Sequence, residues 1–179
     1  MYERLRYIKV SFQGFPPRYT IRASIRKNGE YMRALLQRVS RASVTVDEKI
    51  VGHIGQGLLV FLGIGHEDNE TTVKTLVDKI VQLRIFPDKQ GKMNLSLLDI
   101  QGEILVVSQF TLHADVSRGR RPSFTKAAPP SVAIPLYELF KEMCTKYGLT
   151  VASGIFGALM SVELRNEGPV TIWIDTEEL

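Results

Sequence analysis

Cysteine, histidine and long apolar stretches are all scarce in this sequence. Its one cysteine, Cys144, cannot form a disulfide within the chain, which suits a reducing compartment, so we expect a cytoplasmic protein. No apolar run approaches the roughly 18 residues of a membrane span, so we expect no transmembrane helix. The histidines, His53, His66 and His113, lie far apart, and none has the spacing of a motif such as His-Glu-x-x-His. We therefore expect no zinc site or other metal site.

The rest of the composition is that of a globular protein. The chain has 179 residues, of which 44% are hydrophobic and 23% charged, and this favours one compact domain. Charge is unevenly distributed. Residues 1–31 hold seven of the 23 basic and two of the 19 acidic side chains, a local +5, which leaves the rest of the chain at −1.

The basic segment 1–31 has three interpretations. It is a basic arm for nucleic acid, an Arg-rich targeting peptide, or sequence upstream of a translation start at Met32. We favour the third, because no later motif depends on this segment. The predicted organisation is thus an N-terminal extension, 1–31, followed by one domain, 32–179.

Short apolar segments predict a strand-rich domain after Met32. Strands are expected over 33–39, 43–46, 50–54, 58–63, 103–111, 158–165 and 170–175. Asp47-Glu48-Lys49 forms a hairpin turn, and Asn166-Glu167-Gly168-Pro169 separates the last two strands.

Two segments have helical spacing. The first is capped by Asp68 or Asn69 and runs to about Leu83, and the second is capped by Ser131 and ends at Gly148. The second helix has an apolar face of Leu136, Leu139, Phe140, Met143 and Tyr147, and places Cys144 as a core thiol. We predict an α+β domain with a curved or barrel-like sheet and two main helices packed on it.

One strand turns polar at its carboxyl end, at Ser108-Gln109-Phe110-Thr111-Leu112. This is an ordinary strand end or one wall of a cleft. Strand alternation places Ser108 and Thr111 on opposite faces, and Thr111 on the same face as His113. A hydroxyl and imidazole pair is possible there, although no third group that would orient the base is evident.

Two further segments have both a structural and a functional interpretation. The segment 113–126 carries four cations and an aromatic residue, and is either a solvated loop or a flap that binds a polyanion, which we favour. Its members are Arg118, Arg120, Arg121, Lys126 and Phe124. Gly168-Pro169 is either a hairpin turn or a cis peptide whose carbonyls face a ligand.

Taken together, four motifs resemble the D-aminoacyl-tRNA deacylase family. They are Met32 to Val39, Ser108 to Leu112, Arg121-Pro122-Ser123-Phe124 and Asn166 to Thr171, in that order along the chain. The resemblance covers 32–179 and implies a homodimeric cytoplasmic hydrolase without a required cofactor. Its substrate would be the ester that joins a D-amino acid, or glycine mischarged on tRNA-Ala, to the 3′ end of tRNA.

The resemblance also implies roles for particular residues. Gly168 and Pro169 form a Gly-cis-Pro motif that enters the partner subunit's pocket, holds the substrate's α-amino group with backbone carbonyls and rejects L-aminoacyl-tRNA. The opposite wall is formed by Ser108, Gln109, Phe110 and Thr111. Met160 flanks the substrate, Phe156 stacks on the terminal adenine, Arg38 supports the Gly-Pro turn, and the loop cations Arg118, Arg120, Arg121 and Lys126 bind tRNA.

Chemically, we expect Thr111 not to be an obligatory nucleophile. The ribose 2′-hydroxyl of the tRNA would activate water, while N–H groups near Phe110 and Thr111 stabilise the oxyanion. Two alternatives stay open: a nucleic-acid-binding module on the same fold without deacylase activity, and a hydrolase of an unrelated small ester that uses Thr111 and His113.

Overall fold

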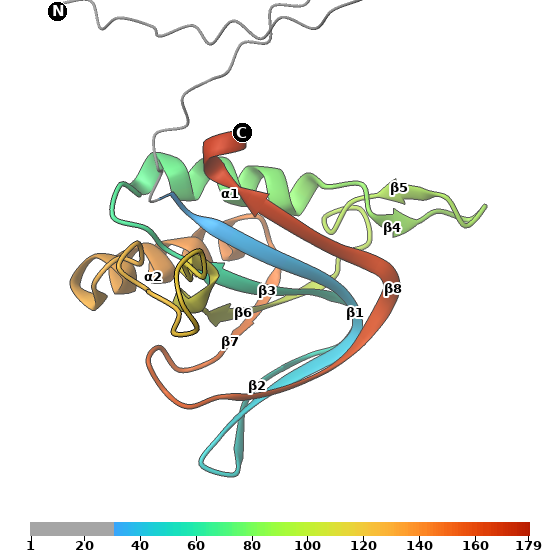
Figure 1. The fold of residues 1–179 in the computed structure, drawn as a ribbon. Helices are drawn as coiled ribbons and strands as arrows, with labels where there is room; N and C mark the ends of the chain where they lie inside the picture. The colour runs from blue at the N-terminus through green and yellow to red at the C-terminus, as the bar shows by residue number, and fades with distance from the viewer. Residues whose placement is uncertain (1–30) are drawn as a thin grey trace, which may run out of the picture.

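The structure is a computed structural model that describes residues 31–179 (Figure 1). The predicted extension lies outside these residues apart from Tyr31, so its role and the division at Met32 stay predictions. The elements are β1 Arg33–Val46, β2 Lys49–Ile54, β3 Gly57–Gly63, α1 Glu70–Gln82, β4 Phe86–Pro87, β5 Met93–Leu95, β6 Glu103–Ser108, the 3-10 helix η1 Phe110–His113, α2 Pro130–Lys146, β7 Thr150–Ser153, β8 Ser161–Asp175 and the 3-10 helix η2 Thr176–Glu178.

A strongly bent sheet forms the body of the domain. Its order is β2-β1-β3-β6-β7, with β8 paired to β1 along almost the whole length of both strands. The pair β3 and β6 and the pair β6 and β7 are parallel, and α1 and α2 lie in the connections between them. Figure 1 shows the sheet curling toward a barrel below the two helices. The predicted α+β class and barrel-like sheet are confirmed.

The sheet is buried on both faces at its centre. In β3, Leu58, Val60 and Leu62 face the core beneath the helices, whereas Leu59 faces a second core inside the curl. β6 divides its residues between the two cores in the same way. Because alternate residues enter different cores, these strands appear in the sequence as continuous apolar runs.

The first helix forms as predicted. Asn69 is its N-cap, and the Asn69 Oδ1 atom accepts from the N–H groups of Thr71 and Thr72 at 2.9 and 3.2 Å. Its buried positions are Val73, Leu76, Val77, Ile80 and Val81. Neither α1 nor α2, the two α-helices of residues 31–179, is long and apolar enough to span a bilayer.

Two predicted strand breaks are wrong. Segments 33–39 and 43–46 form the single strand β1, because Ser40-Arg41 offers no turn and shifts of register against β8 absorb the bend. Likewise 161–175 is one strand, so Gly168-Pro169 is not a hairpin turn. The turn at Asp47-Glu48 is confirmed, since both residues have positive φ values, 48° and 63°.

The region around α2 requires further corrections. α2 begins at Pro130 with Pro129 as its N-cap and no side-chain cap, so the predicted role of Ser131 is wrong. Tyr147, predicted on the apolar face, is 40% exposed and donates to Asp78, whereas Tyr137 and Cys144 are in the core. Gly148 ends the helix with φ +80°, as predicted.

The short strand β7 was not predicted, because four residues carry no clear period. It lies under β2: a Cβ atom on Gly52 would come within 2.6 Å of the Ser153 carbonyl oxygen. Glycine at position 52 therefore lets β2 approach β7 closely and close this side of the curl.

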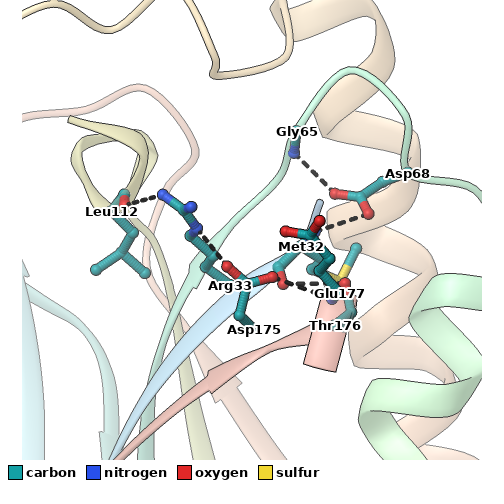
Figure 2. Close-up of polar contacts among 8 residues, drawn as sticks. All are labelled: Met32, Arg33, Gly65, Asp68, Leu112, Asp175, Thr176 and Glu177. Atoms are coloured by element: carbon teal, nitrogen blue, oxygen red, sulfur yellow. Dashed lines mark hydrogen bonds and ion pairs between the residues drawn. The ribbon is translucent and has the colours of Figure 1, made fainter. Parts of the chain in front are cut away.

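A buried carboxylate fixes the start of β1 (Figure 2). The Asp68 Oδ1 atom accepts from Met32 N at 2.8 Å, and its Oδ2 atom accepts from Gly65 N at 2.7 Å. Thr176 N donates to the Met32 carbonyl at 3.0 Å. Burial raises the pKa of Asp68 to about 6, against the lowering effect of the two N–H donors.

This raised pKa makes folding stability depend on pH. Between about pH 4 and 6, Asp68 in the folded protein keeps a proton that the unfolded chain releases. The contribution of Asp68 to the free energy of unfolding is therefore largest below about pH 4. It is lost as pH rises through 6, by up to about 3 kcal/mol. We expect Asp68→Asn to remove this decline from denaturant-unfolding free energies measured between pH 4 and 8. Glu67→Gln, an exposed neighbour, should keep the wild-type slope. Parallel slopes for wild type and Asp68→Asn would contradict the assignment.

Candidate active site

A pocket of about 310 Å³ opens at the carboxyl ends of the parallel strands β3 and β6. This is the edge of a parallel sheet where ligands commonly bind. Five of the predicted site residues line it, from the end of β6, from η1 and from the connection between β7 and β8. They are Ser108, Gln109, Phe110, Phe156 and Met160. The structure therefore brings together residues that lie up to 52 positions apart in the sequence.

The predicted strand 103–111 ends early, at Ser108. Gln109 N donates to the Leu62 carbonyl at 2.8 Å, and η1 then reverses the chain. Thr111 consequently does not lie on a regular strand face. Its side chain is exposed and its Oγ1 atom accepts from Gln109 Nε2 at 2.5 Å, so Thr111 adjoins the pocket through Gln109 and is not part of its lining.

The possible pair of Thr111 and His113 does not form. His113 is fully buried, and neither ring nitrogen has a hydrogen-bond partner among residues 31–179. Burial, with a smaller effect of the nearby Arg33 charge, lowers the pKa of His113 and keeps the ring neutral near pH 7. His113 therefore anchors η1 by packing and does not serve as a base for Thr111.

Phe110 connects the pocket to the basic loop. Its ring is 56% exposed and packs edge-to-face on Phe124, with centroids 5.1 Å apart. The loop is closed by a bridge between Asp115 and Ser123, in which each N–H donates to the other carbonyl. The predicted loop at 113–126 is thus confirmed from Ala114 onward and borders the pocket.

The four predicted loop cations differ in their surroundings. Arg118, Arg120 and Arg121 are exposed and form no ion pair within the described part of the chain. Lys126 is less free, because its Nζ atom lies 3.8 Å from the Asp115 carboxylate. The three arginines are therefore the side chains available to an anionic ligand.

Gly168 and Pro169 lie on the exposed strand β8, away from this pocket. The peptide bond between them is cis, as expected from the sequence. Arg38 supports the segment as predicted: Nε donates to the Glu167 carbonyl at 3.1 Å, Nη2 to the Gly168 carbonyl at 3.2 Å, and Nη1 to the Ile85 carbonyl. Neither Gly168 nor Pro169 lines the pocket of its own chain.

Other candidate groups have structural roles. Burial raises the pKa of the Cys144 thiol to about 12, so this residue is a core thiol and not a nucleophile. His66 Nε2 lies 3.0 Å from the Thr125 carbonyl, where it braces the base of the basic loop. Residues 31–179 contain no group of three or more His, Cys, Asp and Glu side chains that could hold a metal ion.

Sequence reasoning missed two contributors to the site. Leu159, 95% exposed, forms part of the pocket rim, and the Ile85 carbonyl is the third acceptor of Arg38. An exposed leucine and a backbone carbonyl leave no pattern in a single sequence. Both are recognised once the fold places them beside Met160 and Arg38.

Comparison with known proteins identifies the family. Residues 35–175 match the family model described as D-Tyr-tRNA(Tyr) deacylase. A protein of Thermomicrobium roseum named D-aminoacyl-tRNA deacylase is 57% identical over 148 residues, which are 83% of this chain and 96% of that protein. A protein of Bacillus pumilus with the same name is 53% identical over 147 residues, 82% of this chain and 100% of its own length.

Two solved structures are similar in fold. One, named c-Myc DNA Unwinding Element Binding Protein, is 44% identical with a TM-score of 0.74, over 79% of this chain and 97% of that one. The other, a probable eukaryotic D-amino acid tRNA deacylase, is 21% identical with a TM-score of 0.71, over 80% and 98%. On the family match and the high identity over most of its length, the chain belongs to the D-aminoacyl-tRNA deacylase family of hydrolases.

Proposed function

We propose that this protein hydrolyses the ester bond of D-aminoacyl-tRNA and rejects L-aminoacyl-tRNA. The observation that carries the proposal is the pocket itself: residues of one family motif, Ser108 to Leu112, and of the β7 to β8 connection line a cavity beside a loop with three arginines that form no ion pair within residues 31–179. The names of the relatives, 53–57% identical over most of the chain, support the same substrate class.

A complete site needs a second subunit. The exposed Gly168 and Pro169 cannot act in a pocket that they do not line, so a neighbouring copy must supply them. β8 also favours such pairing. Among the described strands this fifteen-residue strand pairs with β1 alone, so its other edge is unpaired, and its Leu164 and Trp173 side chains are exposed. A soluble protein usually covers such an edge. The protein is accordingly a homodimer with an active site at the subunit interface.

Backbone acceptors account for the choice of chirality. The Gly168 and Pro169 carbonyls of one subunit bind the α-amino group of the substrate in the other, and this fixes the α-carbon without contact to the side chain. An L-residue then directs its side chain into the pocket wall. Glycine has no side chain that could clash with the pocket wall. Glycyl-tRNA, including glycine mischarged on tRNA-Ala, should therefore also be cleaved.

Water performs the hydrolysis. It attacks the ester carbonyl, the bond to the ribose 3′-oxygen breaks, and that oxygen takes a proton as the D-amino acid and tRNA leave. The ribose 2′-hydroxyl orients the water, and the backbone N–H groups of Phe110 and Thr111 stabilise the oxyanion. Because Thr111 has no neighbouring base within residues 31–179, it is not the covalent nucleophile.

The tRNA lies along the basic loop. Arg118, Arg120 and Arg121, assisted by Lys126, bind phosphates, while Phe156 stacks on the terminal adenine. Phe156 is already held against Tyr137, with ring centroids 5.8 Å apart and planes at 65°, which presents its ring at the pocket. The substrate and the single buried thiol both favour the cytoplasm as the place of action.

A second candidate is a nucleic-acid-binding module without deacylase activity. It is favoured by one observation, the 44% identity to the solved protein named for binding a DNA unwinding element. The same loop arginines would serve this function, so the two candidates differ in hydrolysis and not in electrostatics.

Matched D-Tyr-tRNA and L-Tyr-tRNA decide between them. We expect the full-length protein to release tyrosine from the D-ester at least about 100-fold faster than from the L-ester, because collision excludes the L side chain from the pocket. The measurement follows the loss of acid-precipitable label over time from tRNA that carries labelled tyrosine. Binding of both esters without cleavage would support the module instead.

The same assay tests the chemistry. A D-ester on tRNA ending in 2′-deoxyadenosine should be cleaved far more slowly, and mass spectrometry of quenched reactions should find no acyl group on Thr111. Full-rate cleavage of the deoxy substrate, or a trapped acyl-Thr111, would overturn this mechanism.

A further inference from the structure

We propose that Arg33, which does not line the pocket, is a positioning residue for the active site. Its guanidinium lies between the last residue of β8 and η1, as Figure 2 shows. Nε is 2.9 Å from Asp175 Oδ2, and Nη1 donates to the Leu112 carbonyl at 3.0 Å. This inference rests on the proposed function, since it assigns a role in the same reaction.

The bond to Leu112 acts on the segment that carries the pocket wall. η1 is one short turn, and Leu112 directly follows Thr111 and lies two residues after Phe110. The start of the turn is held by the bond from Gln109 N to the Leu62 carbonyl. Its end presents carbonyl groups that have no partner within the helix, and Arg33 satisfies one of them. Arg33 therefore sets the direction in which the Phe110 and Thr111 N–H groups point.

The packing of the Phe110 and His113 side chains does not set the direction of η1. The Phe110 ring is more than half exposed, so core packing does not fix it. The His113 ring is buried but neither ring nitrogen has a hydrogen-bond partner within residues 31–179, so its packing anchors the turn without directing it.

The chemistry of arginine suits the arrangement. One planar group reaches a carboxylate and a carbonyl at once, and its Cζ atom lies over the Trp173 ring, 5.6 Å from the ring centre. The side chain is only 21% exposed, so these contacts are sheltered from solvent. Lysine has a single ammonium group and cannot reproduce both bonds in one plane.

The test compares full-length wild type with Arg33→Ala, Arg33→Lys and a matched control, Lys141→Ala. Lys141 is 22% exposed, pairs with Glu138 and lies over the Tyr137 ring, so its loss removes the same kinds of contact elsewhere. We expect both Arg33 variants to lower kcat for D-Tyr-tRNA by about 10- to 100-fold with little change in KM, because the reacting groups are displaced and tRNA binding is not. The control should keep wild-type kcat.

Amide hydrogen exchange of the peptide 109–114 gives a second readout that needs no activity. It should speed up at least about tenfold in the Arg33 variants, because η1 loses its anchor, and not in Lys141→Ala. Wild-type exchange in Arg33→Lys, or in a folded Arg33→Ala, would overturn the inference, as would equal losses of kcat in an Arg33 variant and the control. If wild type itself fails to cleave D-Tyr-tRNA, the proposed function fails, and exchange alone still decides whether Arg33 positions η1.

Discussion

Replacing Gly57 by alanine should strongly destabilise the folded protein. Gly57 begins β3 beside Glu103, the first residue of β6. A Cβ atom at position 57 would fall onto the Glu103 carbonyl group, 2.7 Å from its carbon and 2.8 Å from the backbone nitrogen. Both partners are backbone, so one central strand would have to move. We expect a loss of at least about 4 kcal/mol in unfolding free energy, measured by urea denaturation.

Gly55→Ala is the matched control for this result. Its Cβ atom would meet only the end of the flexible Glu103 side chain, at 3.6 Å. Stability should therefore stay within about 1 kcal/mol of wild type. Equal stability of the two alanine variants would show that β3 and β6 can separate without cost, contrary to their burial in both cores.

Arg38→Ala should give the largest loss of activity in a protein that still folds. It removes the donors to three carbonyl groups, those of Ile85, Glu167 and Gly168, and the last of these is proposed to bind the substrate amine. We expect kcat/KM for D-Tyr-tRNA to fall by about 100-fold, the effect of a displaced binding group. Arg41→Ala is the control, because Arg41 lies exposed on the same strand and its guanidinium donates to no carbonyl within residues 31–179.

Mixing two inactive variants separates action within a subunit from action across the interface. Ala158→Trp should block the pocket that Ala158 lines. In a heterodimer of Arg38→Ala and Ala158→Trp, the open pocket belongs to the Arg38→Ala subunit and receives an intact Gly168-Pro169 turn from its partner. We expect up to about half of the wild-type sites to recover in such heterodimers. No recovery, or full activity of Arg38→Ala alone, would refute the shared site.

The sequence predicted best what local patterns determine. Periodicity found α1, and Asn69, one of its two predicted caps, is the N-cap. The continuous apolar runs found β3 and β6, because both faces of these strands are buried. The prediction from sequence failed where contacts between residues far apart in the chain determine the secondary structure. The chain at Ser40 continues as a strand because β8 runs beside it, and β7 is a strand because β6 and β2 lie against it.

The same distinction between local patterns and distant contacts applies to the active site. The motif from Ser108 to Thr111 could be named from the sequence, but its conformation could not. A strand pattern continues past Ser108, and the fold ends the strand there because Gln109 bonds to Leu62 on a neighbouring strand. The contact of Arg33 with Leu112 joins residues 79 positions apart, and no periodicity extends that far. These are the parts of the site that tertiary contacts create.

The pairing of β1 with β8 also orders events during synthesis. Arg33, at the start of the first strand, pairs with Asp175, 142 residues later, so the first strand obtains this neighbour only when the last strand has been made. At ribosomal rates the interval is roughly 7–30 s, long compared with the collapse of a small chain. Throughout that time one edge of β1 is unpaired and open to other chains. The ribosome therefore releases a domain whose barrel is closed last, by the strand that also carries Gly168 and Pro169.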